Sequence, residues 1–295
     1  MNIINFGSLN IDRVYNVESF VRAGQTVSSL GFNTFCGGKG LNQSIAAARA
    51  GASVIHAGAI GPDGEMLEIC LRDSGVNVAS LAHLPTATGH AIIQVDPNGQ
   101  NCIIVTGGAN MELTTEYIDR VLAQGQPGDI VLLQNEVNNL PYIMESAHRL
   151  GFRLAVNPSP ITPELLKAPF ELADWLILNE LEGAEIAGCT GSNAEILQTL
   201  HTKFPSTAIV LTLGSDGVVY RDANQTASER CFPVKAVDTT AAGDTFCGYF
   251  LAGCIEGLPV QACLTLASQA AAIAVTRAGA STSIPTRGEV RSYTF

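Results

Sequence analysis

The chain has 295 residues, of which 46% are hydrophobic and 15% are charged, and its formal net charge is −11. This composition is typical of a compact folded chain and excludes a largely disordered one. Nucleic acids and anionic membrane surfaces are bound by clustered basic residues, whereas the 16 Lys and Arg residues here are scattered. We therefore expect neither partner, and an anionic ligand would need helix N-termini, placed cations or metal ions.

The cysteines and the N-terminus indicate the cellular compartment in which the protein works. The eight cysteines include no C-x-x-C pair and lie mostly in apolar runs, so we expect small buried thiols in a reducing compartment. The five histidines are isolated and are expected to be structural or surface residues. The N-terminus runs directly into an apolar strand without a basic leader, and no apolar run reaches membrane-spanning length. These features predict a cytoplasmic protein.

Two polar residues follow the first expected strand, at 2–9. Asn10 and Asp12 lie two positions apart, so they would face the same side and could hydrogen-bond the hydroxyls of a ligand. In open α/β sheets ligands bind at the carboxyl ends of the strands. An Asx turn explains the same two residues equally well.

A glycine-rich segment comes next. Strand-like residues at 24–35 lead into Gly37, Gly38, Lys39 and Gly40, and a helix is expected to follow. The glycines let a ligand approach the backbone closely, and the cation among them favours a phosphate cradle. The spacing matches neither the P-loop nor the dinucleotide fingerprint.

The remaining elements alternate between strands and helices. Strands are expected at 53–60, 89–95, 101–106, 130–133, 153–156, 175–178, 208–213 and 218–221, and helices at 63–74, 140–150, 180–187 and 259–276. This alternation predicts an α/β fold with a mostly parallel sheet and helices on both faces, in one domain spanning 1–295. The hairpin at 89–106, together with strand material at about 13–35, predicts a small extra sheet that would act as a lid and exclude water.

Polar residues recur just after the strands. They are Gln134, Asn135, Glu136, Asn157, Asn179, Glu182, Thr212 and Ser215. Each alone is best explained as a helix cap. Because all fall at one edge of the predicted sheet, together they outline a cleft suited to a sugar and a magnesium-bound nucleotide.

Residues 238–246 read Asp-Thr-Thr-Ala-Ala-Gly-Asp-Thr-Phe and precede a helix-length run of small and apolar residues. We expect a loop whose backbone amides open a helix and attract an anion. An aspartate there repels phosphate unless it accepts a proton from the attacking group, so Asp244 indicates phosphoryl transfer to a hydroxyl. A helix merely capped by Asp244 explains this stretch equally well.

Five segments, at 7–12, 37–43, 179–182, 212–217 and 238–246, read GSLNID, GGKGLNQ, NELE, TLGSDG and DTTAAGDTF. In this order and spacing they resemble the ribokinase-like carbohydrate kinases, and the resemblance covers essentially the full length. It implies ATP-dependent phosphorylation of a sugar's primary hydroxyl, with the 5-hydroxyl of D-ribose as the expected acceptor.

The resemblance also implies the role of individual residues. Asp244 would be the general base, and Ala241, Ala242 and Gly243 would form the anion hole. The sugar would be held by Asn10, Asp12, Gly38, Lys39, Asn42, Glu136 and Asp244, so Lys39 becomes a sugar contact. The nucleotide would lie on Asn179, Thr212, Gly214, Ser215, Gly217, Gly243 and Ser268, with Glu182 serving Mg²⁺ indirectly. A monovalent cation, usually K⁺, would be bound by Asp238, Thr240, Ala274, Arg277, Gly279 and Ser283, several of them through backbone carbonyls.

The sequence departs from the pattern of this family near the sugar. Leu41 replaces a common alanine, Asn135 and Val137 flank Glu136 differently, and Tyr249 replaces a small residue. The alternative substrates are deoxyribose, a ketohexose or a nucleoside, and a non-catalytic sugar- or nucleotide-binding relative is a remote third hypothesis. The exposed face of the lid sheet is expected to form a homodimer interface.

Overall fold

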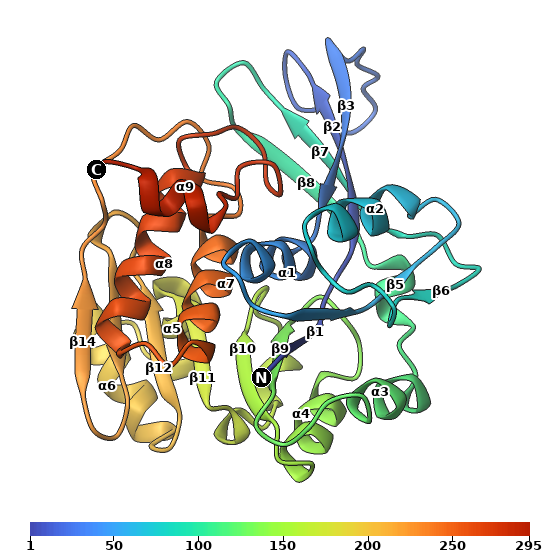
Figure 1. The fold of residues 1–295 in the computed structure, drawn as a ribbon. Coiled ribbons are helices and arrows are strands. Elements are labelled where there is room, and N and C mark those ends of the chain that lie inside the picture. Colours follow the sequence, from blue (N-terminus) through green and yellow to red (C-terminus); the bar gives the residue numbers. More distant parts are fainter.

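The computed structural model describes residues 1–295, and its centre is an eight-stranded sheet (Figure 1). The strand order is β14 (Thr226–Glu229), β13 (Val218–Arg221), β12 (Ala208–Thr212), β11 (Trp175–Asn179), β10 (Arg153–Asn157), β9 (Ile130–Gln134), β1 (Ile3–Phe6) and β4 (Val54–Ala57). From β12 to β4 neighbouring strands are parallel, and β13 and β14 are antiparallel. The parallel strands are almost continuously apolar, as strands buried on both faces require.

Helices cover both faces of this sheet and enclose two buried apolar clusters. The first cluster lies under α1 (Lys39–Arg49), α2 (Glu65–Asp73), α7 (Ala242–Ile255), α8 (Val260–Ala274) and α9 (Arg287–Ser292). The second lies under α3 (Thr115–Leu122), α4 (Leu140–Arg149), α5 (Glu180–Ala187) and α6 (Asn193–Lys203). Short 3₁₀ turns are η1 (Gly108–Met111), η2 (Leu165–Lys167), η3 (Phe170–Leu172) and η4 (Gly214–Asp216). The predicted fold class is confirmed.

A separate four-stranded sheet, called the lid below, projects from the main body (Figure 1). Its order is β3 (Gly31–Gly37), β2 (Asn10–Asn16), β7 (Gly89–Val95) and β8 (Asn101–Thr106). The predicted hairpin strands at 89–95 and 101–106 are confirmed to the residue. Because β2 begins soon after β1 ends, and β3 leads directly into α1, the lid is tied to the carboxyl edge of the main sheet.

Three strand predictions are wrong in extent. The strand expected at 2–9 ends at Phe6, and Asn10 and Asp12 lie within β2, not in an Asx turn. The strand expected from residue 24 begins only at Gly31, because Gly24 adopts a φ of 75° within a turn and the residues that follow have no strand partner. The strand expected at 53–60 is broken at Gly58, where a Cβ would lie 2.7 Å from the carbonyl oxygen of Gly7. Beyond the break, β5 (Ala59–Ile60) pairs with β6 (Ala82–His83) instead.

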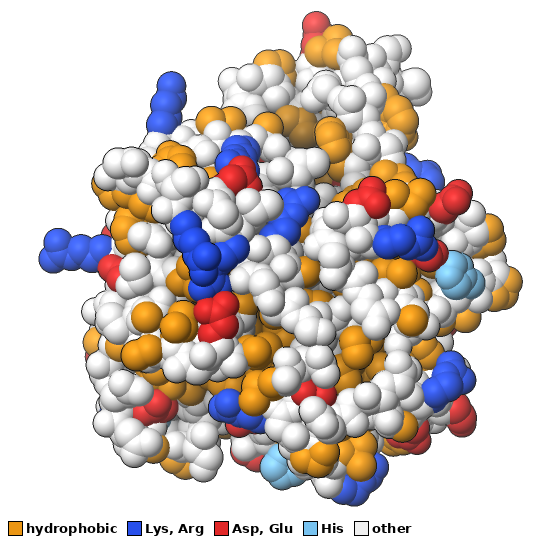
Figure 2. Space-filling model, viewed as in Figure 1, with side chains coloured by type: hydrophobic (Ala, Val, Ile, Leu, Met, Phe, Trp, Pro, Cys, Tyr) orange, Lys and Arg blue, Asp and Glu red, His pale blue; other side chains and the backbone are white.

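The exposure of the cysteines and the distribution of the basic side chains test two further expectations. Cys247 and Cys263 are buried and four other cysteines are half-buried, but Cys102 and Cys231 are exposed, so the expectation of buried thiols is wrong for these two. Cys102 is exposed because every side chain of β8 is exposed. Basic side chains are dispersed on the face shown in Figure 2 and form no cluster there. No helix has the length and apolar character needed to cross a membrane.

Candidate active site

The site lies where the parallel strands β9 to β12 end in Gln134, Asn157, Asn179 and Thr212. A polar cavity of about 240 Å³ opens there, and a second cavity of about 740 Å³ adjoins it. The two share Asn179, Thr212, Thr239, Ala242 and Gly243 in their linings. Of the polar residues predicted along this edge, five line the two cavities, namely Asn157, Asn179, Glu182, Thr212 and Ser215, whereas Gln134, Asn135 and Glu136 line neither.

Asp244 lines the polar cavity and is 7% exposed. Its Oδ2 accepts a hydrogen bond from Asn42 Nδ2 at 3.0 Å, and its Oδ1 accepts one from Gln43 Nε2 at 2.8 Å. The N-cap of α7 is Ala241, and no side chain caps this helix. The interpretation of Asp244 as a mere helix cap is therefore wrong, because its carboxylate is held instead by two amides of α1.

The first turn of α7 leaves backbone amides directed at the cleft. Ala241 adopts a φ of 59°, and Ala242 N–H makes only a long hydrogen bond of 3.3 Å to Thr239 O. The N–H groups of Gly243 and Asp244 have no protein acceptor. A Cβ at Gly243 would meet nothing within 4 Å, so the space before these amides is open. Unpaired amides at the positive end of a helix suit an anion.

The sugar-side residues gather at the base of the lid. Asn10 is buried, and its Oδ1 accepts a hydrogen bond from Asn110 Nδ2 at 2.9 Å. Asp12 lies against Gly37, where a Cβ would come within 2.0 Å of the Asp12 carboxylate. Gly38 adopts a φ of 97°, which favours glycine. Gly37 therefore makes room for the side chain of Asp12, and Gly89, whose Cβ would lie 2.4 Å from Asn10 Oδ1, makes room for that of Asn10.

Two carboxylates face each other across this base. Burial and the neighbouring Glu136 raise the pKa of Asp12 to about 7. Burial also raises the pKa of Glu136, although the hydroxyl of Ser8 and the charge of Lys39 oppose that shift. Glu136 accepts hydrogen bonds from Ser8 Oγ and from the backbone N–H of Lys39, the latter at 3.0 Å. The raised pKa values favour the protonated form of these carboxyl groups in the absence of a hydrogen-bond donor or cation that stabilises the charge.

Lys39 lines the polar cavity together with Glu182 and Asp244. Burial lowers the pKa of Lys39, but Asp244, Glu136 and Glu182 outweigh that effect, so the net pKa lies above its usual value. The side chain is thus a half-buried cation near three carboxylates. Ala241, Ala242 and Gly243, at the start of α7, line the same cavity as Lys39.

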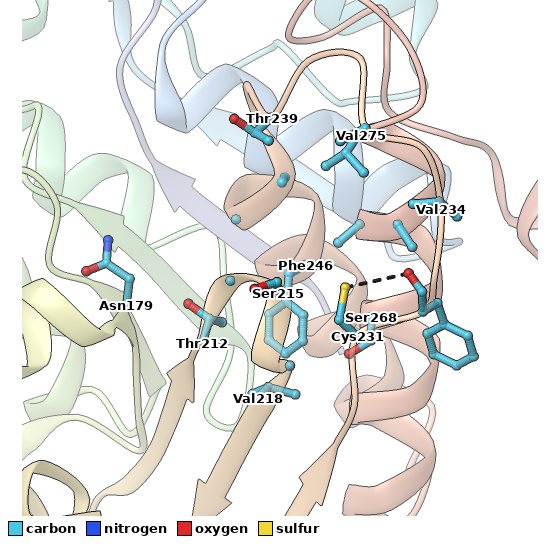
Figure 3. A pocket seen from close by; sticks show the side chains of 18 of the residues that line it. Asn179, Thr212, Ser215, Val218, Cys231, Val234, Thr239, Phe246, Ser268 and Val275 are labelled. Atoms are coloured by element: carbon cyan, nitrogen blue, oxygen red, sulfur yellow. Dashed lines mark hydrogen bonds between the residues drawn. The ribbon is translucent and has the colours of Figure 1, made fainter. Parts of the chain in front are cut away.

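The larger cavity is lined by all seven residues expected at the nucleotide, namely Asn179, Thr212, Gly214, Ser215, Gly217, Gly243 and Ser268. Figure 3 shows Asn179, Thr212 and Ser215 on one side of this cavity and the apolar Val234 and Val275 across from them. The larger cavity thus has a polar end near the polar cavity and an apolar end under α8. A nucleotide has the same two parts, because its phosphates are polar and the faces of its base are apolar.

Comparison with known proteins decides the family. Residues 2–287 match the model of the pfkB family carbohydrate kinases. The chain belongs to the pfkB family of carbohydrate kinases. It is 34% identical to the ribokinase of Bacillus subtilis, over 98% of each chain, and 28% identical to the deoxyribokinase of Salmonella typhimurium, over 99% of this chain and 98% of that one. The structure of Arabidopsis thaliana ribokinase complexed with ribose and ATP matches 99% of each chain with a TM-score of 0.87 and 27% identity.

The predicted family and class of activity, an ATP-dependent sugar kinase, are thus confirmed. The residues expected to hold the sugar lie mainly on the lid and α1, and those expected at the nucleotide line the larger cavity. Asp244 lines the polar cavity that adjoins it.

Glu182 combines structural and chemical contacts. It forms a capping box with Asn179, in which Glu182 Oε2 accepts from Asn179 N at 3.0 Å and Asn179 Oδ1 accepts from Glu182 N at 2.9 Å. The expectation that such residues cap helices is therefore correct for Asn179, yet both side chains also line the polar cavity. No group of three or more His, Cys, Asp or Glu side chains converges as a metal site. This donor set fits Mg²⁺ held mainly by phosphate oxygens and waters, with Glu182 beyond the waters.

The residues expected around a monovalent cation lie in two loops joined by Asp238. Its Oδ1 accepts from Thr240 N at 2.9 Å, and its Oδ2 accepts from Gly279 N at 2.9 Å. The carbonyl of Ala274 accepts from Arg277 N at 3.1 Å, and Ser283 Oγ donates to Ala280 O at 2.8 Å. The structure therefore brings the two loops together beside the first turn of α7.

Sequence reasoning missed several residues of the site. Gln43 contacts Asp244 although 201 positions separate them, and Asn110 reaches Asn10 across 100 positions. No local pattern marks such long-range contacts. The apolar wall formed by Phe232, Pro233 and Val234 was also missed, although a short apolar run outside any expected element was a usable signal.

Proposed function

We propose that this protein transfers the γ-phosphoryl group of ATP to the 5-hydroxyl of D-ribose, giving ribose 5-phosphate and ADP. The observation that carries the proposal is the buried Asp244 carboxylate, held by Asn42 and Gln43 where the lid side of the cleft meets the nucleotide side. Asp244 accepts the proton of the attacking hydroxyl as the phosphoryl group transfers.

The groups around Asp244 supply the remaining chemistry. The amides at the start of α7, from Ala241 to Gly243, receive the transferring phosphoryl group. Lys39 lies in the same cavity and neutralises charge on that group while it borders the sugar. Mg²⁺, held by the ATP phosphates and by Glu182 through water, would neutralise the phosphate charge. These backbone and cationic groups act by position and charge, which is how phosphoryl transfer is accelerated.

A buried unpaired atom supports a sugar with several hydroxyls. Asn42 Oδ1 has no hydrogen-bond partner in the protein, while its Nδ2 is held by Asp244. A buried amide oxygen without a donor is costly, and a sugar hydroxyl would supply the donor. With Asn10, Asp12 and Glu136 nearby, the sugar side offers acceptors for more than one hydroxyl. The relative at 34% identity is a ribokinase and the one at 28% a deoxyribokinase, which favours ribose over deoxyribose.

We further propose activation by K⁺ at the loops joined by Asp238. Backbone carbonyls in two tied turns are hard ligands for such a cation, and the site would lie beside the anion hole. A bound cation there would hold the 238–241 turn and thereby fix the first amides of α7. Addition of KCl in place of choline chloride should then raise turnover.

The lid supports a homodimer. The face of the lid opposite Asp12 carries exposed apolar side chains, namely Phe32 on β3, Ile92 on β7 and Ile104 on β8. We propose that a second copy covers them, because monomeric proteins rarely expose such a patch. We also propose that residues 1–295 form one kinase domain that includes the lid, and that the protein is cytoplasmic, which eight free thiols support.

A coupled ADP-release screen tests the proposed function. Ribose, deoxyribose, fructose, pseudouridine and common nucleosides are compared with Mg-ATP, with and without K⁺. Ribose is expected to give the highest kcat/KM. A higher value for another sugar or a nucleoside would replace ribose as the substrate, and the absence of turnover with all of them would favour a binding protein.

A further inference from the structure

Gln43 on α1 is fully buried, and all the hydrogen-bonding positions of its amide are used. Its Nε2 donates to Asp244 Oδ1 at 2.8 Å and to Asn157 Oδ1 at 2.9 Å. Its Oε1 accepts from Gln134 Nε2 at 2.7 Å and from the thiol of Cys247 at 3.6 Å. A buried amide with every position satisfied has one orientation, because turning it over would set donor against donor and acceptor against acceptor.

The orientation of this amide can be traced to the backbone. The carbonyl oxygen of Gly40 can only accept, and it takes a hydrogen bond from Asn5 Nδ2 at 2.8 Å. Asn5 Oδ1 must then face Gln134, whose Nε2 donates to it at 3.1 Å. The same Nε2 donates to Gln43 Oε1, which leaves Gln43 Nε2 directed at Asp244. A buried chain from β1 through β9 to α1 therefore aims one N–H at the proposed base.

We propose that Gln43 is the positioning residue of Asp244, and that Gln134 and Asn5 fix the direction of its amide. The inference rests on the proposed function of Asp244 as base. Gln43 and Asn42 each donate to a different oxygen of Asp244, so together they fix the plane of the carboxylate. A base that is free to rotate would reach the hydroxyl in the productive geometry less often.

A purely structural role for Gln43 makes a different prediction. Loss of a packing and hydrogen-bonding group lowers thermal stability but leaves the turnover of the folded protein unchanged. A positioning role lowers kcat and leaves the sugar KM nearly unchanged, because Gln43 does not line the cavity.

The test uses two substitutions and one control, assayed with the sugar that gives the highest turnover in the screen. Gln43→Met keeps the volume and removes the donor, and we expect kcat to fall by about 10–100-fold with the sugar KM within about threefold. Cys247→Ala removes a different buried hydrogen bond to Gln43 but keeps the N–H to Asp244, so kcat should stay within about threefold.

The kcat–pH profile of Gln43→Glu distinguishes the two roles, because a loss of packing alone would not shift it. It sets a second carboxylate beside Asp244, so the acid limb of the kcat–pH profile should move up by about one pH unit or more. The other titratable groups that face Asp244 are Lys39 on α1, Glu136 after β9, Glu182 on α5 and Cys247 on α7, and all are retained.

Asp244→Asn is assayed in parallel to separate the two claims. If Asp244→Asn loses turnover while Gln43→Met keeps wild-type kcat, the positioning role is wrong and the proposed function stands. If Asp244→Asn keeps its turnover, both the positioning role of Gln43 and the role of Asp244 as base are wrong. An unshifted pH profile for a folded Gln43→Glu protein would also overturn the positioning role, even if Gln43→Met is slow.

Discussion

The side chain of Asp12 occupies the space that a Cβ at Gly37 would need, since that Cβ would lie 2.0 Å from Asp12 Oδ2. The two residues come from neighbouring strands of the lid. We predict that Gly37→Ala displaces the carboxylate and weakens sugar binding by roughly 1–3 kcal/mol, as expected when hydroxyl partners are lost.

Titration calorimetry with the preferred sugar measures this effect. Gly288→Ala is the matched control, because the nearest atom to its Cβ would be 4.0 Å away. Sugar affinity within error of wild type for Gly37→Ala would show that Asp12 does not contact the sugar. Asp12→Ala is expected to match Gly37→Ala in size.

The pH dependence of sugar binding follows from Asp12. Burial and Glu136 raise its pKa to about 7, so the free protein binds a proton there below that pH. Sugar hydroxyls donate to the ionised carboxylate, so affinity should be full above pH 8 and fall as the pH drops through 7. The loss approaches about tenfold per pH unit below 7. Calorimetry from pH 5.5 to 8.5 measures it, and Asp12→Asn should flatten the profile; a flat wild-type profile would contradict the assignment.

Glu182 permits a clean test of the magnesium site. Glutamine also completes a capping box, so Glu182→Gln should keep the helix start of α5 and leave the Tm within about 2 °C. Loss of the charge should raise the Mg²⁺ concentration needed for half-maximal turnover by about 10–100-fold. Glu195→Gln, in the capping box of α6, serves as the control. Equal Mg²⁺ dependence of the two variants would exclude Glu182 from the metal site.

The lid predicts the oligomeric state. Ile104 on the edge strand β8 is 60% exposed, and we expect a dimer mass by light scattering at micromolar concentration. Ile104→Lys should give a monomer, because it places a charge in the proposed interface. Leu150→Lys, at an exposed apolar residue after α4, should remain dimeric. A monomer mass for the wild-type protein would show that the lid does not form a dimer interface.

Local patterns in the sequence predicted most of the fold. Continuous apolar runs such as Ile130–Leu133 predicted the buried parallel strands, and the turn at 96–100 predicted the β7–β8 hairpin. The strand expected from residue 24 failed because pairing, not strand propensity, decides where β3 begins. The capping interpretation of Asp244 failed for a related reason, since the partners of its carboxylate come from α1.

In the site as well, local motifs predicted residues that line the cleft but not their hydrogen-bond partners from distant parts of the sequence. Residues within motifs, such as Lys39, Asn179 and Gly243, were identified and lie at the cleft. Gln43 lies within the segment at 37–43 but was given no role, and Asn110 lies in none of the quoted segments. Hydrogen-bond partners separated by a hundred or more positions leave no spacing that a single sequence can show.

The central claim is that Asp244 is the base, and the turnover of Asp244→Asn tests it most directly. Asparagine keeps the shape of the side chain but cannot accept the proton, so kcat should fall about 10²–10⁴-fold while sugar affinity by calorimetry stays near wild type. Near-normal kcat in the folded Asp244→Asn protein would contradict the account.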